Sequence, residues 1–165
     1  MGLFDFIKEA GSKIMGTDEA TEPQSQATTY SPEEIQKIND RRRAMGLAKT
    51  IETLGFEIED LGIRVDDDLA TVSGRVLDQA TKERVVLALG NSAGIARVDD
   101  QIEVEAAEPE AQFYTVESGD TLSGIAKKYY GNAMKYPVIF EANKPMLSDP
   151  DKIYPGQVLR IPPLE

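Results

Sequence analysis

The chain contains neither cysteine nor histidine among its 165 residues. Without cysteine it can form no disulfide bond and offers no thiol nucleophile. Without either residue it lacks the usual ligands of zinc and every histidine-based catalytic triad. Histidine is also the one side chain whose ordinary pKa lies near neutral pH, so a common general acid or base is missing. These absences argue against an enzyme, and we expect a protein without catalytic activity.

Long apolar runs are missing too. No stretch approaches the ~18–20 apolar residues that a membrane-spanning helix needs. The first residues, MGLFDFIKEAGSKIMG, carry acidic side chains within their apolar part. They therefore do not match a secretory signal. We expect a cytoplasmic monomer without membrane contact.

Basic residues are the minority of the charged ones. Lysine and arginine number 18 against 29 aspartates and glutamates, which gives a net charge of −11. Nucleic-acid binding needs clustered basic residues, so no nucleic-acid partner is expected. Arg41–Arg43 spread around a helix, which favours a solvated face. The acidic run at 66–68 lacks the spacing of a calcium loop, and loose binding of divalent ions at the runs 66–68 and 99–100 is the less favoured alternative.

The apolar pattern predicts an α+β fold made of two small domains, in which helices cover one face of a sheet. Two polar stretches without periodicity separate the parts. The predicted divisions are an amphipathic helix over 1–15 that docks on the first domain, a flexible linker over 16–30, the first domain over 31–105, a second linker over 106–112, and the second domain over 113–165.

Capping and turn signals predict the order of elements in the first domain. Ser31 and Glu34 form a capping box around Pro32, and the helix that follows ends near Gly55. Residues 61–76 alternate as a hairpin with its turn at 66–68. Asp78 caps a second helix that ends at Gly90, and a strand follows over 95–104. The predicted order is helix, strand, strand, helix, strand.

The second domain is predicted to run strand, helix, helix, strand. Residues 113–116 form the first strand, and Asp120 or Thr121 caps a helix that ends at Gly131. A further helix begins at Pro137, and a strand over 157–161 closes the unit. About 50 residues are enough for a small core.

The second domain resembles a LysM domain. The resemblance rests on YTVESGDTLSGIAKKYYGN, IFEANK and IYPGQVLRIP, which occur in this order over residues 113–162. Members of that family bind N-acetylglucosamine polymers in a shallow groove between two loops. The resemblance places that groove at Gly119, Asp120, Thr121, Leu122, Ile153, Tyr154 and Pro155.

The first domain resembles a BON domain, through LGIRVDDDLATVSGRV, TKERVVLALGN and AGIARVDDQIEV. The whole arrangement, an N-terminal helix followed by BON and LysM domains, is similar to the small bacterial cytoplasmic potassium-binding proteins of BON–LysM architecture. That resemblance implies a potassium sensor or buffer, without catalysis, whose domains respond to the ion. It makes K⁺ the expected bound ion.

Backbone geometry supplies what potassium chemistry needs. K⁺ is well served by several carbonyl oxygens, and a helix C-terminus offers unpaired carbonyls with a partial negative charge. Glycines at 11, 90 and 94 let the backbone curl, although each can equally be a simple cap or turn. The resemblance places the carbonyl ligands at Ile7, Ala10, Gly90, Ser92 and Ile95.

Two alternative functions stay open at this point. The chain can be a module that binds peptidoglycan or another N-acetylglucosamine polymer through its LysM domain. It can also be an adaptor that offers both domains as surfaces for other proteins. Titration with potassium, sodium and chitin oligomers separates the three hypotheses.

Overall fold

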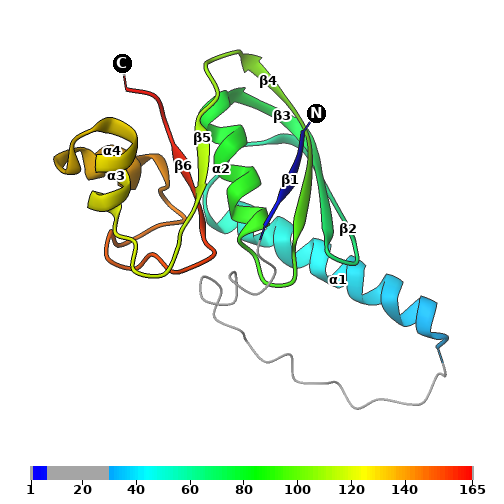
Figure 1. The fold of residues 1–165 in the computed structure, drawn as a ribbon. Helices are drawn as coiled ribbons and strands as arrows, with labels where there is room; N and C mark the ends of the chain where they lie inside the picture. The colour runs from blue at the N-terminus through cyan, green and yellow to red at the C-terminus, as the bar shows by residue number, and fades with distance from the viewer. Residues whose placement is uncertain (1, 7–29, 165) are drawn as a thin grey trace.

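The computed structural model describes residues 2–6 and 30–164, and it has the predicted α+β fold with two units (Figure 1). The first unit holds a four-stranded sheet in the order β1-β4-β3-β2, and the second holds a two-stranded sheet of β5 and β6. Among these described residues, no helix is long and apolar enough to cross a membrane.

Helix α1 (Pro32–Thr53) begins as predicted. Its capping box is complete, because Ser31 accepts a hydrogen bond from the Glu34 N–H while the Glu34 carboxylate accepts one from the Ser31 N–H. The chain then leaves the helix at Gly55, whose φ of +80° suits glycine. Apolar Ile35, Ile38 and Met45 stay exposed, and α1 uses Leu47 and Ile51 to reach the core.

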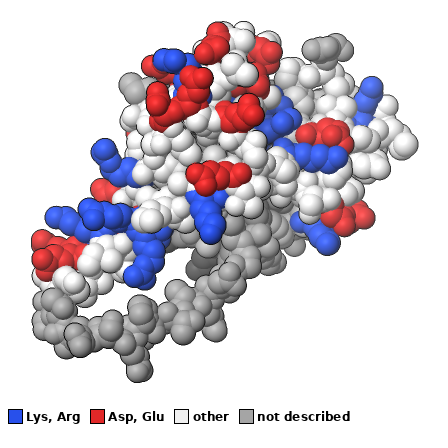
Figure 2. All heavy atoms as spheres, turned by 180° about the vertical axis from the view of Figure 1, so that it is seen from behind, with Lys and Arg blue, Asp and Glu red and all other residues white. Residues whose placement is uncertain are grey.

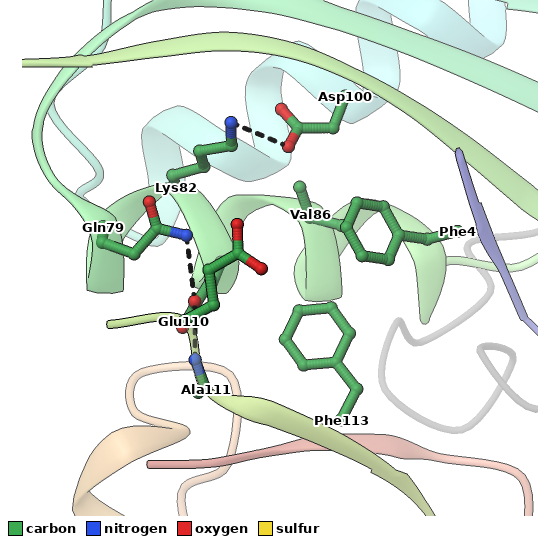
Figure 3. Close-up of a pocket in the computed structure, with 9 residues that line it drawn as sticks. Phe4, Gln79, Lys82, Val86, Asp100, Glu110, Ala111 and Phe113 are labelled. Carbon is green, nitrogen blue, oxygen red and sulfur yellow. Dashed lines mark hydrogen bonds and ion pairs between the residues drawn. The ribbon is translucent and has the colours of Figure 1, made fainter. Parts of the chain in front are cut away.

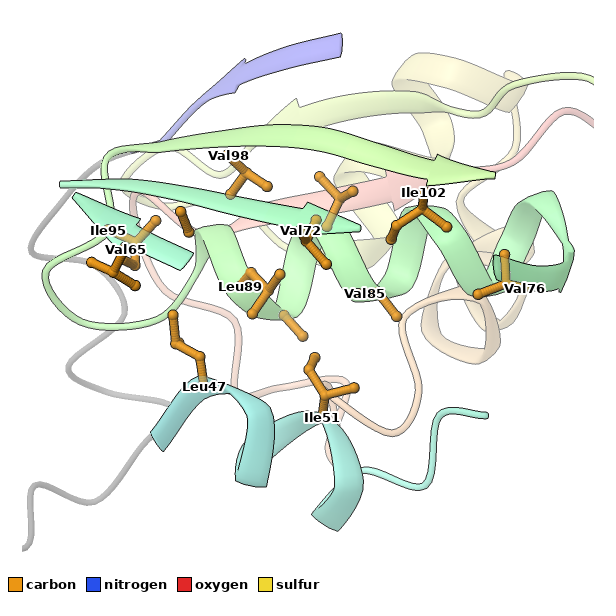
Figure 4. Packing of buried hydrophobic residues seen from close by; sticks show 13 residues of the cluster. Leu47, Ile51, Val65, Val72, Val76, Val85, Leu89, Ile95, Val98 and Ile102 are labelled. Carbon is orange, nitrogen blue, oxygen red and sulfur yellow. The ribbon is translucent and has the colours of Figure 1, made fainter. Parts of the chain in front are cut away.

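The hairpin of β2 (Glu59–Asp66) and β3 (Leu69–Asp78) turns where the sequence predicts, with Asp67 at φ +53°. Helix α2 (Gln79–Gly90) is the crossover that lets β3 pair in parallel with β4 (Arg97–Ala106). Both helices lie on the same side of the sheet, and their apolar side chains form one core with the inward residues of the strands (Figure 4).

The structure of the N-terminal segment differs from the predicted amphipathic helix. Residues Gly2–Asp5 form strand β1 where a helix is predicted, so that prediction is wrong there. Strand β1 pairs antiparallel with the free edge of β4, from Gly2 opposite Asp100 to Asp5 opposite Arg97. Alternate residues of a strand share a face, and Phe4 and Phe6 both pack on the core. The rest of the predicted helix, over 7–15, lies outside the described residues.

The second unit has the predicted order, with a short 3₁₀ helix added. Strand β5 (Gln112–Thr115) pairs antiparallel with β6 (Val158–Ile161). Thr121 caps α3 (Leu122–Tyr130), and Gly131 ends that helix in the left-handed conformation. The 3₁₀ helix η2 (Ala133–Lys135) leads into α4 (Tyr136–Ala142), and the helices and strands enclose a separate core.

Charges of both signs alternate over much of the surface in Figure 2. Arg75, for example, lies 3.8 Å from Glu59 and 3.9 Å from Glu103 across the exposed sheet. The basic side chains at the lower left of that view lie along α1, where Arg41 and Arg42 are exposed. Their exposure agrees with a solvated face for those two arginines.

Candidate functional site

The chain turns sharply after α2, and we call residues 90–95 the 90–95 turn. The Asn91 N–H closes the helix by donating to the Leu87 carbonyl, and the Ser92 N–H donates to the Leu89 carbonyl at 3.1 Å. The Ile95 N–H then donates back to the Ser92 carbonyl at 3.2 Å, with Gly94 between them at φ +81°. Three of the predicted ligands, Gly90, Ser92 and Ile95, therefore lie in one turn at the negative end of a helix.

The carbonyl oxygens of this turn differ in their use. The Ser92 carbonyl accepts one hydrogen bond from Ile95, which leaves a second lone pair. In the described part of the chain, no turn or loop hydrogen bond uses the Gly90 or Ile95 carbonyl. Ser92 and Ile95 are both buried, at 3% and 1% exposure. The turn thus combines available carbonyl oxygens with partial shelter from water.

The N-terminal segment lies directly against this turn. The Phe6 N–H donates to the Ala96 carbonyl, and the Phe6 ring covers the Gly90 backbone so closely that a Cβ at Gly90 would lie 2.0 Å from a ring carbon. Glycine is therefore needed at position 90 for close approach. Ile7 follows Phe6 in the sequence, but Ile7 and Ala10 both lie outside the described residues.

Arg43 also holds the 90–95 turn. Its guanidinium donates to the Gly94 carbonyl at 2.6 Å and to the Asp67 carbonyl, and it lies 3.5 Å from the Asp40 carboxylate. The expected solvated face thus does not extend to Arg43, which joins α1 to two turns. The partners are 24 and 51 residues away along the chain, so no local pattern signals them.

The second unit contacts α2 through buried polar groups. The Asn91 side chain donates to the Val158 carbonyl and accepts from the Val158 N–H, both at 2.9 Å. Glu83 accepts from the Arg160 guanidinium, and its other oxygen accepts from the Ala111 N–H at 2.9 Å. All of these side chains are buried, so each depends on its partner.

A pocket opens between the two units next to these contacts (Figure 3). Lys82 reaches the Asp100 carboxylate at 3.1 Å on one side of the pocket. On the other side, the rings of Phe4 and Phe113 lie 5.4 Å apart, which joins β1 to β5. The N-terminal segment therefore contacts the 90–95 turn through Phe6, just after β1, and the second unit through Phe4 in β1.

The first loop of the predicted sugar groove is made largely of structural contacts. Asp120 accepts from the Tyr114 hydroxyl at 2.7 Å and from the Glu117 N–H at 2.8 Å. The hydrogen bond to Asp120 is the main cause that raises the pKa of Tyr114 to about 12. The other three residues of this loop also have structural roles. Gly119 has a positive φ, Thr121 caps α3, and Leu122 is buried in the core.

The second loop of that predicted groove lines a separate pocket. Ile153 and Tyr154 lie there with Gln157 and Met146, and the four residues of the first loop do not line it. Among the buried polar side-chain atoms of residues 30–164, the Tyr154 hydroxyl has no hydrogen-bond partner. Pro155 is exposed beside it. The structure thus does not gather all seven predicted groove residues around one pocket.

Carboxylates do not assemble a metal centre in the part of the chain that the structure describes, since no group of three or more could hold an ion together. The acidic run at 66–68 forms the hairpin turn, and Asp68 pairs with Arg97 at 3.0 Å. Asp100 is buried against Lys82.

Comparison with known proteins finds a relative that matches nearly the full length of the chain. The chain is 45% identical over 162 residues to the potassium binding protein Kbp of Escherichia coli O6:H1, which covers 98% of this chain and 99% of that protein. The LysM domain family matches residues 114–162. This chain belongs to the family of Kbp, and its second unit is a LysM domain.

Other relatives match only a short part of the chain. An uncharacterised protein of Deinococcus radiodurans is 55% identical over 49 residues, which is 19% of its length. An esterase of Mycobacterium tuberculosis is 47% identical over 53 residues, which is 11% of its length. The matching segment is too small a part of the esterase for its activity to be assigned to this chain.

Proposed function

We propose that this protein binds a potassium ion through backbone carbonyl oxygens of Gly90, Ser92 and Ile95, together with those of Ile7 and Ala10. It then acts in the cytoplasm as a monomeric potassium sensor or buffer, without catalysis. The domain division behind this proposal is a BON domain over 31–105 and a LysM domain over 113–165, joined by the linker over 106–112. The N-terminal segment over 1–15 completes the ion site.

The packing of Phe6 on Gly90 is the observation that carries the proposal. It brings Phe6, the residue before the proposed ligand Ile7, to the turn that contains three other proposed ligands. Membership of the Kbp family supports the choice of potassium, because the relative's name states that ion. The negative end of α2 also favours a cation at this position.

Selectivity would follow from the size of the carbonyl cage and the number of its oxygens. The net charge of −11 attracts all cations alike and cannot distinguish potassium from sodium. A turn held by Arg43 at Gly94 and by Phe6 at Gly90 has limited freedom to contract around a smaller ion. We therefore expect tighter binding of K⁺ than of Na⁺.

Gly90→Ala tests the site. The added Cβ meets the Phe6 ring, so the N-terminal segment has to move away from the turn. Titration calorimetry should then show K⁺ affinity reduced by about tenfold, equivalent to about 1.4 kcal/mol. Gly46→Ala in α1 is the matched control, because a Cβ there meets no atom within 4 Å. Equal K⁺ affinity in both variants would contradict the site.

Glycan binding by the LysM domain is the second candidate. The family match over 114–162 favours it, and Tyr154, whose buried hydroxyl has no hydrogen-bond partner among residues 30–164, is one of the residues that line the pocket of the second loop. Titration with chitin oligomers tests it, and Tyr154→Phe should weaken any binding that uses this hydroxyl. A heat of binding on titration with the sugar, with none on titration with K⁺, would favour the glycan-binding module over the ion sensor. The absence of binding heat in both titrations would favour an adaptor.

A further inference from the structure

The outer side of α1 carries a regular line of exposed residues, which we call the α1 seam. Its members follow one another at alternating steps of three and four residues: Ile35, Ile38, Arg42, Met45 and Lys49. This spacing places side chains along one side of a helix, and it is the spacing with which one helix packs against another. All five residues are exposed, and Met45 is 69% exposed.

The α1 seam faces away from the core of the first domain. Helix α1 reaches that core through Leu47 and Ile51, which each lie two residues beyond a seam position and so about half a turn round the helix. Residues 31–39 are all exposed, and Figure 1 shows the first turns of α1 extending past the sheet. Ile35 and Ile38 lie in these turns and do not belong to the core.

Basic side chains accompany the apolar ones on this part of α1 (Figure 2). Lys37, Arg41, Arg42 and Lys49 are all exposed, and among the residues that the structure describes none of the four forms an ion pair. The chain has 29 acidic residues against 18 basic ones, so the lack of acidic partners here is not caused by a shortage of carboxylates. A carboxylate-bearing partner matches this surface in charge.

A groove of about 450 Å³ lies beside the C-terminal end of the α1 seam. Lys49 and Thr53 of α1 line it together with Pro145 and Met146 of the loop after α4. The Thr53 hydroxyl donates to the Lys49 carbonyl at 2.8 Å, and the Thr50 hydroxyl donates to a carbonyl of the same helix at 3.0 Å. These hydroxyls are bonded within α1, so the groove suits an apolar side chain.

We propose that the α1 seam is a docking surface for an acidic amphipathic helix of another protein. The partner helix packs apolar side chains on Ile35, Ile38 and Met45 and sets carboxylates beside Arg42 and Lys49. A helix suits this surface better than an extended segment, because the backbone of α1 is bonded within its own helix and offers no edge to a strand. This inference goes beyond potassium binding and does not depend on it.

Two other occupants fit the α1 seam less well. An anionic membrane repels a chain with a net charge of −11, and the seam has no aromatic side chain to anchor it in the lipid interface. A second copy of the chain packed in parallel would set Arg42 against Arg42 and Lys49 against Lys49, which is unfavourable. Both occupants are outcomes of the test.

The probe is a fluorescent synthetic peptide of about 20 residues, with leucine at alternating three- and four-residue steps and glutamate elsewhere. The same peptide with lysine in place of glutamate is the control. Fluorescence anisotropy with the full chain should show binding of the acidic peptide, and binding of the lysine peptide at least tenfold weaker. Added salt should weaken the binding, because the attraction between exposed charges is screened.

Substitutions on and off the α1 seam test its residues. Met45→Ser and Arg42→Glu should each weaken binding of the acidic peptide at least fivefold. The matched controls are Met134→Ser and Lys135→Glu, which make the same kinds of change at exposed positions of the LysM domain and should bind within twofold of the parent chain. All four variants should keep the thermal midpoint of the parent chain, since none removes a core side chain.

Several results would overturn the proposal. These are equal binding of the two peptides, no binding of the acidic peptide, or equal losses in the seam and control variants. Vesicles of phosphatidylglycerol that bind the parent chain but not Met45→Ser would assign the seam to a membrane instead. A dimer in sedimentation that Met45→Ser abolishes would assign it to a second copy. Titration with K⁺ tests the ion site separately, so failure of one proposal leaves the other standing.

Discussion

The buried ion pair between the domains gives the largest expected loss of stability. Glu83 in α2 and Arg160 in β6 are 5% and 8% exposed, and Glu83 also accepts from Gln79 and the Ala111 N–H. Glu83→Gln keeps the size of the side chain but leaves the Arg160 charge without its carboxylate. Removing one partner of a buried pair costs about 3 kcal/mol or more.

Thermal unfolding measures that loss. For a chain of this size, about 3 kcal/mol corresponds to a fall of roughly 6–12 °C in the midpoint. Glu141→Gln is the matched control, because Glu141 pairs with Lys144 at 2.7 Å on the surface. An exposed pair contributes only about 0–1 kcal/mol. If both variants lose equally little stability, the buried pair does not hold the two domains together.

Two further predictions concern the helix start and the tyrosine at the LysM turn. Asp78→Ala removes the acceptor of the Thr81 N–H at 2.7 Å and should destabilise the protein by about 1 kcal/mol in urea unfolding; an unchanged midpoint would contradict this role for the cap. Asp120→Asn removes the carboxylate whose hydrogen bond with the Tyr114 hydroxyl is the main cause that raises the pKa of Tyr114 to about 12, so the pKa should fall toward 10 in a titration followed by NMR. Because the folded pKa of Tyr114 is the higher one, its contribution to stability is complete below pH 10 and is lost as the pH rises through about 12. A Tyr114 pKa that stays near 12 in Asp120→Asn would show that another group causes the shift.

Much of the fold could be predicted because its signals are local. The capping box at Ser31 and Glu34, the Asp78 cap of α2 and the turn at Asp67 each depend on residues within a few positions of one another. Such short-range hydrogen bonds form largely independently of the rest of the fold. The order of elements in both domains follows from them.

The N-terminal strand could not be predicted in this way. Leu3, Phe4, Phe6 and Ile7 fit an amphipathic helix, and a stretch this short also fits a strand. The free edge of β4 decides between them, because it pairs with the backbone of β1. That edge is about 95 residues further along the chain, so the deciding contact is tertiary.

The contacts between the domains could not be predicted from short-range sequence patterns either. Asn91 is 67 residues from Val158, and Glu83 is 77 residues from Arg160. An asparagine after a helix reads as an ordinary cap, and a glutamate within a helix reads as a surface charge. Only the packing of α2 against β6 shows that both are buried. The family resemblance indicated the 90–95 turn, whereas its connection to the LysM domain comes from the structure.

A crystal soaked in a rubidium salt tests the carbonyl site most directly, because Rb⁺ replaces K⁺ and scatters anomalously. We predict one strong anomalous peak at the C-terminal end of α2, within coordination distance of the Gly90, Ser92 and Ile95 carbonyl oxygens. No peak there, or a peak coordinated by the carboxylates at 66–68 or 99–100, would contradict the proposed site.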